Sequence, residues 1–367
     1  MANSFIEVKE IARQTLPRLI ENLVFPNLIY KDYSQDFVTG KGAKIQVKKP
    51  VVLTASEFNE STGTTAQDVK EESVEVVLDK LATVDVEFGA IQKVTNVDDL
   101  NRLFLEPAAV ALAEKINSDG LYLYKDIPYT VGTAGTTPSS LNDLADARKE
   151  LNIQKVPTAG RVAVWDPEAD AKFTTIDALV NAEKSGTTQA LREGSIGRVF
   201  GLDNYMAQGI KKHTAGKLTS AKIATKAKAG DTTLSLTVTS GDKLVKGDVL
   251  KVGKYQFAVA EDVDASSTSM TVKITTAVKE DINANAGVTV VADHTANLAF
   301  NPNAFAFVTR PLVPAKGGAE SYTTSYNGIS LRVTVGYDMK YKKEMLSMDV
   351  LYGYKTMYEE LATRVLG

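Results

Sequence analysis

The sequence has two histidines, and they are its only imidazole groups that could act as acid, base or metal ligand. His213 and His294 stand at the two ends of a segment whose composition differs from the rest of the chain. If those ends meet in space, the imidazoles come together and form a contact that responds to pH near about 6–7, because the unperturbed pKa of histidine is ~6.5. The simpler alternative is two independent histidines, each at the surface or in an ordinary hydrogen bond.

Two glycine-rich runs approach known site motifs without matching them. A phosphate loop needs four residues between its first glycine and a Gly-Lys-Ser/Thr, but five separate Gly247 from Gly253, and Tyr255 follows Lys254. This run is therefore predicted to form a β-turn. The run Gly194-Ser195-Ile196-Gly197 lacks the glycine spacing of a nucleophile elbow, so we interpret it as a loop.

Acidic residues likewise form no site. The run from Asp262 to Ser266 opens like a calcium-binding loop, but Ser267 and Lys273 stand where that loop needs Gly and Glu. Adjacent carboxylates splay apart on a helix or strand, as in the pairs Glu71/Glu72, Asp98/Asp99 and Glu359/Glu360. The sequence thus offers no catalytic, cofactor-binding or metal-binding residues, and we predict that the protein is not an enzyme and needs no cofactor.

The composition limits the remaining functions. The 367 residues include no cysteine, which excludes disulfides, thiolate nucleophiles and cysteine-based metal sites and leaves burial to supply the stability. The 42 Lys and Arg residues are balanced by 45 Asp and Glu, which gives a net charge of −3. We therefore expect no basic surface that binds nucleic-acid phosphates. No stretch approaches the ~20 apolar residues of a membrane-spanning helix. Acids among the first ten residues are unlike a signal peptide.

The first 80 or so residues predict a helix followed by a projecting arm. Ser4 and Glu7 have capping-box spacing, and apolar residues then recur with helical period. Pro17 is expected to kink or break this helix, whose apolar face packs in the chain's own core or on a neighbouring subunit. Strands are predicted around a polar loop, 54–73, which exceeds the ~12–15 residues usual in a compact domain. A long two-stranded arm that leans on another surface fits best.

The rest of the chain mixes helices with strands. The predicted elements, in order, are a strand at 84–88, a helix at 107–124, a helix capped by Ser140 and Asp143, strands at 161–165, 304–309, 329–335 and 345–354, and a short amphipathic stretch at the end. The helix at 107–124 is expected to bury one stripe of side chains, namely Ala108, Ala111, Leu112 and Ile116.

A change of composition marks residues 217–295, which contain no proline or arginine and only two aromatics, Tyr255 and Phe257. Short, evenly spaced strands separated by Gly-Asp turns predict a small β-sandwich or barrel here. Because mixed sequence resumes on both sides, we interpret this segment as a domain inserted where two chain ends of its host lie close together.

Several short segments, spread in order over nearly the whole chain, resemble one family. They are Ala2-Asn3-Ser4-Phe5, Glu21 to Leu28, Tyr33 to Phe37, Val97 to Arg102, Pro107 to Ile116, Gly194 to Gly201 with Tyr205, Asn297 to Phe300, Ala304 to Ala306 and Asp349 to Gly353. Together they resemble the major capsid proteins of tailed bacteriophages, which have the Hong Kong 97 fold. The branch that they resemble carries an inserted β-domain and is typified by the coat protein of short-tailed Salmonella phage.

The resemblance implies an α+β, Hong Kong 97-like capsid fold with an inserted all-β domain. The implied parts are an N-arm at 1–36, an extended β-hairpin loop at 37–82, a peripheral domain with a spine helix at 83–130, an axial domain at 131–214 that returns at 296–327, an inserted β-barrel-like domain at 215–295, and peripheral strands with a C-terminal segment at 328–367.

The resemblance also implies a function. The chain would self-assemble into pentamers and hexamers of an icosahedral head around double-stranded DNA, without sequence-specific DNA binding and without a membrane. Scaffolding protein and portal protein are the implied partners. The protein would be assembled in the bacterial host cytoplasm and become part of the virion, with procapsid maturation moving the arms. Two alternatives stay open, since fold does not fix function: a cargo-enclosing shell protein of the encapsulin kind, and a β-rich virion decoration or adhesion protein.

Overall fold

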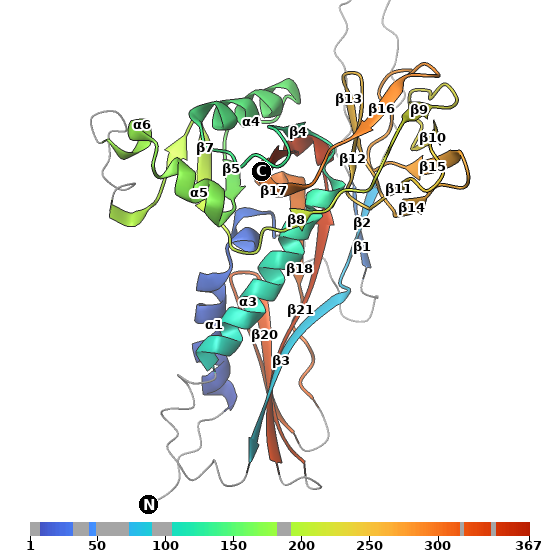
Figure 1. Cartoon of the computed structure of the whole chain (residues 1–367). Helices are drawn as coiled ribbons and strands as arrows, with labels where there is room; N and C mark the ends of the chain where they lie inside the picture. Colours follow the sequence, from blue (N-terminus) through green and yellow to red (C-terminus); the bar gives the residue numbers. More distant parts are fainter. Residues whose placement is uncertain are drawn as a thin grey trace, which may run out of the picture.

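The computed structural model describes residues 8–31, 44–48, 73–89, 105–181, 192–315, 319–338 and 343–367. Within these ranges the chain forms an elongated body of helices and two sheets, with a separate group of short strands on one side (Figure 1). No helix among the described residues is long and apolar enough to cross a membrane.

Two helices lie side by side along the body: α1 (Val8–Asn22) and α3 (Glu106–Leu121), each followed by a short 3-10 helix, η1 (Phe25–Leu28) and η5 (Tyr122–Asp126) (Figure 1). The predicted break at Pro17 does not occur, since α1 continues through it. On α3, the expected buried stripe is correct for Ala108, Leu112 and Ile116, but Ala111 is exposed. Ala109 and Ala113 are buried in its place because α3 is covered over a wider arc than one stripe.

The helices cover one face of a long antiparallel sheet. Its strands are β3 (Lys80–Gly89), β18 (Phe305–Thr309), β19 (Glu320–Tyr326), β20 (Ile329–Asp338) and β21 (Lys343–Thr356). The order is β18-β21-β20-β19, and β3 also pairs with β21. Alternate residues of β20, such as Leu331 and Val333, are fully buried beneath the helices, as expected for a sheet with one covered face.

A second sheet has seven strands. They are β4 (Thr130–Val131), β5 (Arg161–Trp165), β6 (Arg198–Val199), β7 (Leu202–Met206), β8 (Lys212–His213), β17 (His294–Phe300) and β22 (Ala362–Leu366). Three helices pack against this sheet: α4 (Leu141–Ile153), α5 (Pro167–Phe173) and α6 (Asp177–Val180). The capping box of Ser140 and Asp143 is present at the start of α4, as predicted. The chain's last strand, β22, joins this sheet by pairing with β17 and β4.

The remaining strands form what we call the β-lobe, residues 215–293. They are β9 (Ala221–Ile223), β10 (Thr233–Thr237), β11 (Lys243–Leu244), β12 (Val249–Val252), β13 (Tyr255–Ala258), β14 (Val263–Asp264), β15 (Ser269–Lys273) and β16 (Gly287–Val290). Six of them make one sheet, in the order β13-β12-β16-β9-β10-β15. The β-lobe has a hydrophobic core of its own, drawn only from residues within it.

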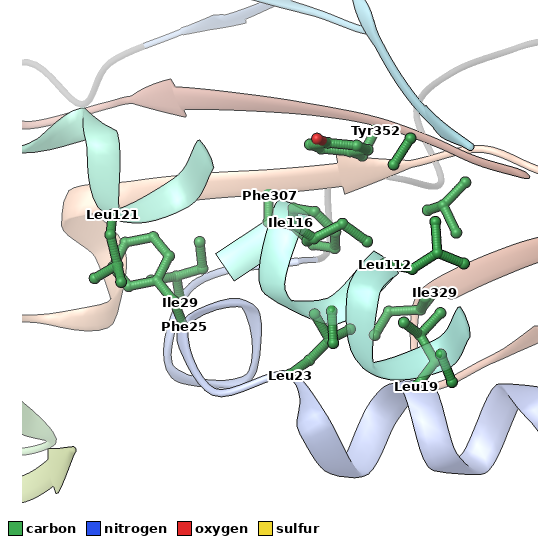
Figure 2. Close-up of a cluster of buried hydrophobic side chains, with 14 of the residues drawn as sticks. Leu19, Leu23, Phe25, Ile29, Leu112, Ile116, Leu121, Phe307, Ile329 and Tyr352 are labelled. Atoms are coloured by element: carbon green, nitrogen blue, oxygen red, sulfur yellow. The ribbon is translucent and has the colours of Figure 1, made fainter. Parts of the chain in front are cut away.

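The largest core belongs to the body, by which we mean the described residues outside the β-lobe. Side chains from α1, α3 and the strands meet in it, as Figure 2 shows for Leu19, Leu112, Ile116 and Ile329. Phe25 is fully buried where the aromatic rings of both sheets converge, with ring centroids 5.6 Å from those of Phe300 and Phe305. The two helices and both sheets are thus joined by one apolar interior.

Candidate assembly elements and a buried polar junction

The two strands that flank the predicted arm are described by the structure, and the second is fixed to the body by apolar packing. Strands β1 (Lys44–Lys48) and β2 (Ser73–Val77) pair antiparallel, with Lys44 opposite Val77. Val76 of β2 and Leu78, just after β2, are buried and pack against Ala306, Val308 and Met357 of the body, and we call this set the arm root. The loop at 54–73 lies outside the described residues apart from Ser73.

One glycine makes the arm root possible. At Gly353 of β21, an added Cβ would lie 2.0 Å from the carbonyl oxygen of Val77 and 3.3 Å from the Cα of Leu78. Both neighbours are backbone atoms, so no rotamer change can relieve the contact. The arm therefore crosses the sheet at the one place on β21 where the side chain is a hydrogen atom.

The N-terminal helix is held by its own chain. The apolar face of α1, including Ile11, Leu16 and Leu19, is buried in the body's core rather than left for a neighbouring subunit. The Asn117 side chain of α3 fastens the end of α1: its Oδ1 accepts from the backbone N–H groups of Val24 and Phe25, and its Nδ2 donates to the carbonyl of Asn22. The Asn22 carbonyl is one that the end of α1 leaves free, and the two N–H groups stand at the start of η1, where a helix leaves its first N–H groups free.

The two ends of the β-lobe meet, as the sequence predicted. Strands β8 and β17 pair antiparallel with His213 directly opposite His294, and the centroids of the two imidazole rings are 5.2 Å apart. Both histidines are buried, with exposures of 2% and 0%. The alternative of two independent histidines is therefore wrong.

Further polar groups surround this histidine pair. Nε2 of His213 lies 2.8 Å from Oδ1 of Asp248, and Nδ1 of His213 lies 3.1 Å from the hydroxyl of Tyr124. Asp248 is fully buried and also accepts from the backbone N–H of Val245 at 2.7 Å. Since a carboxylate only accepts, Nε2 of His213 donates to it, and the Tyr124 hydroxyl donates to Nδ1 when the imidazole is neutral.

A buried arginine completes the group. Arg364 of β22 is 0% exposed, and its Nη1 donates to the carbonyl of Gly247 at 2.7 Å. Its Nη2 donates to the carbonyl of Lys125 at 3.2 Å, and its guanidinium lies 5.2 Å from the ring centroid of Tyr124. The bond to Gly247 joins β22 of the body to the β-lobe. We call these five residues, Tyr124, His213, Asp248, His294 and Arg364, the junction cluster.

Burial changes the protonation of this cluster. It lowers the pKa of His294 to about 4, and the nearby positive charge of Arg364 acts in the same direction. It lowers the pKa of Arg364 to about 10 and raises the pKa of Tyr124 to about 12. At neutral pH the cluster thus holds a charged Arg364, a neutral His294 and a neutral Tyr124. The contact expected near pH 6–7 exists, but in the folded chain His294 takes up its proton only at about pH 4.

The hydrogen bonds also fix the tautomer of His294. Its Nδ1 lies 2.8 Å from the carbonyl of Ala292, which can only accept, so Nδ1 carries the proton. Its Nε2 is then an acceptor, and it is buried without a hydrogen-bond partner among the described residues. The Nε–H of Arg364 is a buried donor in the same condition. The cluster therefore leaves one acceptor and one donor unused in its interior.

The other motifs of the sequence are used for turns. Gly247 has φ +96° and lies against Lys125, whereas Gly253 sits in the hairpin turn between β12 and β13, so the predicted β-turn is confirmed. Gly194 and Gly197 have positive φ and lie outside helices and strands, as predicted for a loop. In the acidic run, Asp262 accepts from the backbone of Lys246, and the described residues contain no group of three or more potential metal ligands.

Three members of the junction cluster were not predicted from the sequence. Asp248 belongs to a Gly-Asp turn pattern and Tyr124 ends a predicted helix, and neither pattern points to a buried polar site. Arg364 had a partial signal in the sequence, where it stands among Leu361, Ala362, Val365 and Leu366, and the structure shows that all five residues of its strand β22 are buried. A lone arginine inside such an apolar run marks a buried cation that needs acceptors.

Comparisons with known proteins bear on the fold as a whole. No protein-family model matches the chain, and no curated protein matches it. Among solved structures, a chain from Mycobacterium phage Che8 is similar over 94% of this chain and 90% of its own length, with a TM-score of 0.55 and 17% identity. A chain from the capsid structure of cyanophage P-SCSP1u is similar over 94% and 88%, with a TM-score of 0.53 and 12% identity.

These likenesses cover nearly the whole chain from end to end. At 17% and 12% identity they establish architecture, not activity. The protein therefore has the mixed helix-and-sheet fold of phage capsid proteins, as the resemblance in the sequence indicated.

Proposed function

We propose that the protein is the major capsid protein of a tailed bacteriophage. It assembles into pentamers and hexamers of an icosahedral head that encloses double-stranded DNA. The observation that carries this proposal is a likeness to phage capsid folds over 94% of the chain. The proposal rests on the fold of the chain and assigns it no enzymatic activity.

The parts of the fold take assembly roles in this proposal. The N-terminal segment with α1 is the N-arm, β1 and β2 begin an extended loop that reaches a neighbouring subunit, and α3 is the spine helix on the long sheet. The seven-stranded sheet belongs to the axial domain at the centre of a capsomer, and the β-lobe is an inserted domain of the Hong Kong 97 branch typified by short-tailed Salmonella phage coat protein. Scaffolding protein and portal protein are its partners in the host cytoplasm.

The charge balance supports this role. A net charge of −3 gives the chain no general attraction to phosphates. Many lysines of the β-lobe are also paired with acids at the surface, for example Lys226 with Asp281 at 2.8 Å and Lys254 with Glu280 at 3.0 Å. A shell built from subunits with this balance of charge would confine DNA without binding it at fixed positions.

Expression of the chain alone tests the proposal. Closed shells, sheets or capsomers in electron micrographs and in sedimentation support a coat protein, whereas a stable monomer at high concentration contradicts it. Particles isolated from the producing cells then separate the two shell functions. Nuclease-protected double-stranded DNA supports the phage head, and a protein cargo without DNA supports the encapsulin-like alternative.

The arm provides a second test. Deleting residues 54–73 should leave a subunit with an unchanged folded core, because the arm root packs without them, but shells should no longer assemble. Unaffected shells would overturn the role of the arm. A chain that is monomeric but decorates preformed phage heads would support the decoration alternative.

A further inference from the structure

The β-lobe and the body have separate hydrophobic cores, so the contacts at their boundary hold the β-lobe in its position. Beside the junction cluster, the contacts across the boundary include a bond from the Thr130 amide to Gln256, a bond from Lys279 to the Tyr129 hydroxyl, and a small apolar cluster. That cluster consists of Val249, Val291 and Leu366 with Ala134. The two main cores share no residue, and of the junction cluster only Tyr124 belongs to one of them.

The junction cluster is balanced in charge when its histidines are neutral. It holds one cation, Arg364, and one carboxylate, Asp248, both with 0% exposure. His294 faces Arg364 from β22, His213 from β8 and Asp248 from the β-lobe, and Tyr124 and Asp126 of η5 act on Arg364 from the other side. Asp248 is the acid that acts on His294. A proton on His294 would add a second positive charge beside Arg364, where Asp248 is the fully buried carboxylate and Asp126 acts on Arg364 from the other side, and poorly compensated buried charge destabilises a contact.

We propose that the junction cluster is an acid-sensitive latch, which holds the β-lobe against the body while His294 is neutral and releases it, with both cores still folded, when His294 is protonated. This inference does not depend on the proposed capsid function. It concerns a rearrangement within one chain.

Proton linkage predicts how steeply the ratio of open to closed molecules changes with pH. In the closed state burial holds the pKa of His294 at about 4, and in the open state the imidazole meets water and its pKa returns to about 6.5. The open state therefore binds the proton more readily across this range. For one proton, the ratio of open to closed molecules should rise about tenfold per pH unit as pH falls from about 6.5 to 4.

Hydrogen exchange on the full-length, unassembled protein tests the latch. Exchange is followed by mass spectrometry between pH 7 and 4.5, with the intrinsic pH dependence removed. Peptides covering 125–134, 212–217 and 245–252 report the junction, and peptides of α3 and β10 report the two cores. We expect junction protection to fall about tenfold per pH unit below 6.5 while both cores stay protected.

Two variants separate the latch from general acid sensitivity. His294→Gln keeps a polar side chain that does not titrate, so its junction peptides should show no slope. Asp170→Asn is the matched control, because the pKa of Asp170 is raised by burial but its helix α5 lies outside the junction. This variant should keep the slope of the parent. An unchanged slope in His294→Gln, or loss of protection in cores and junction together, would overturn the proposal.

A measurement on the unmodified protein guards against a folding defect in the variant. The chain has only two histidines, so NMR of labelled histidine shows two imidazoles. At pH 5.5 the expected His294 signal is neutral with the proton on Nδ1 in molecules whose junction is protected. A protonated His294 beside fully protected junction amides contradicts the latch.

Discussion

The arm root and the junction cluster both join segments far apart in the sequence, yet they do so by different physics. At the arm root, Val76 and Leu78 pack on apolar side chains, and the fit depends on shape, above all on Gly353. At the junction, Arg364 and Asp248 are buried charges whose contribution depends on every partner being present and correctly protonated. The arm root should therefore tolerate changes of pH but not of volume, and the junction should behave in the opposite way.

The largest expected effect comes from the apolar side of this comparison. Phe25→Ala removes a fully buried ring that contacts Phe300, Phe305 and Tyr354, and we expect a loss of about 4 kcal/mol in the free energy of unfolding. Urea denaturation of the unassembled protein measures it. Phe200→Ala, at a residue that is 41% exposed, is the control and should change little. Equal losses in both variants would show that the core of the body is not organised around Phe25.

Breaking the polar side should cost somewhat less. Arg364→Met retains apolar volume but leaves the carbonyls of Gly247 and Lys125 without their donor and Asp248 without a nearby cation, so a loss of about 3 kcal/mol is expected. The matched change at an exposed ion pair, Lys254→Met, should have no measurable effect, because solvent screens that pair. If Arg364→Met were as stable as the parent in urea, the junction would be held by its apolar contacts alone.

A pair of glycines tests the shape dependence of the arm root. Gly353→Ala forces a Cβ against the backbone of Val77 and should lower stability by about 2–3 kcal/mol. On the neighbouring strand β20, the Cβ of Gly336→Ala would meet only Ala319, at 3.9 Å, so this variant should be neutral or slightly stabilised. Thermal unfolding of the two variants side by side gives the comparison. Similar melting temperatures would mean that the arm is not seated on β21.

The smallest effect is the pH dependence, and it should be confined to the junction. The folded-state pKa of His294, about 4, lies below the unfolded value of about 6.5, so the unfolded chain binds more protons between these values. Stability from this group is present above pH 6.5 and is lost as pH falls. Relative to His294→Gln, the parent should lose about 2 kcal/mol between pH 6.5 and 5. Gly353→Ala should keep the parent's pH dependence of stability. A changed pH dependence in this variant would show that the arm root and the junction cluster are coupled.

Local patterns predicted most of the elements. Apolar patterns located β3 and β20, and the spacing of Ser140 and Asp143 located the start of α4, because these signals lie within a few neighbouring residues. The exposure of Ala111 could not be read this way, since the width of the buried arc on α3 depends on what packs around it. The continuation of α1 through Pro17 is similar: burial of its apolar face outweighs one lost backbone hydrogen bond.

By itself, the sequence determined the kinds of element, the resemblance to capsid proteins in the order of its segments and the absence of disulfides, and it raised the contact between His213 and His294 as a hypothesis that the structure then decided. Composition is counted over the whole chain and periodicity is seen among neighbouring residues, so neither needs coordinates. Only the tertiary structure decided that α1 packs on its own chain, that the arm crosses β21 at Gly353, and that Arg364 and Asp248 are buried beside the two histidines. These features depend on burial and on contacts between residues 35 to 117 positions apart, such as His213 with Asp248 and Arg364 with Gly247, which determine both packing and the protonation of His294.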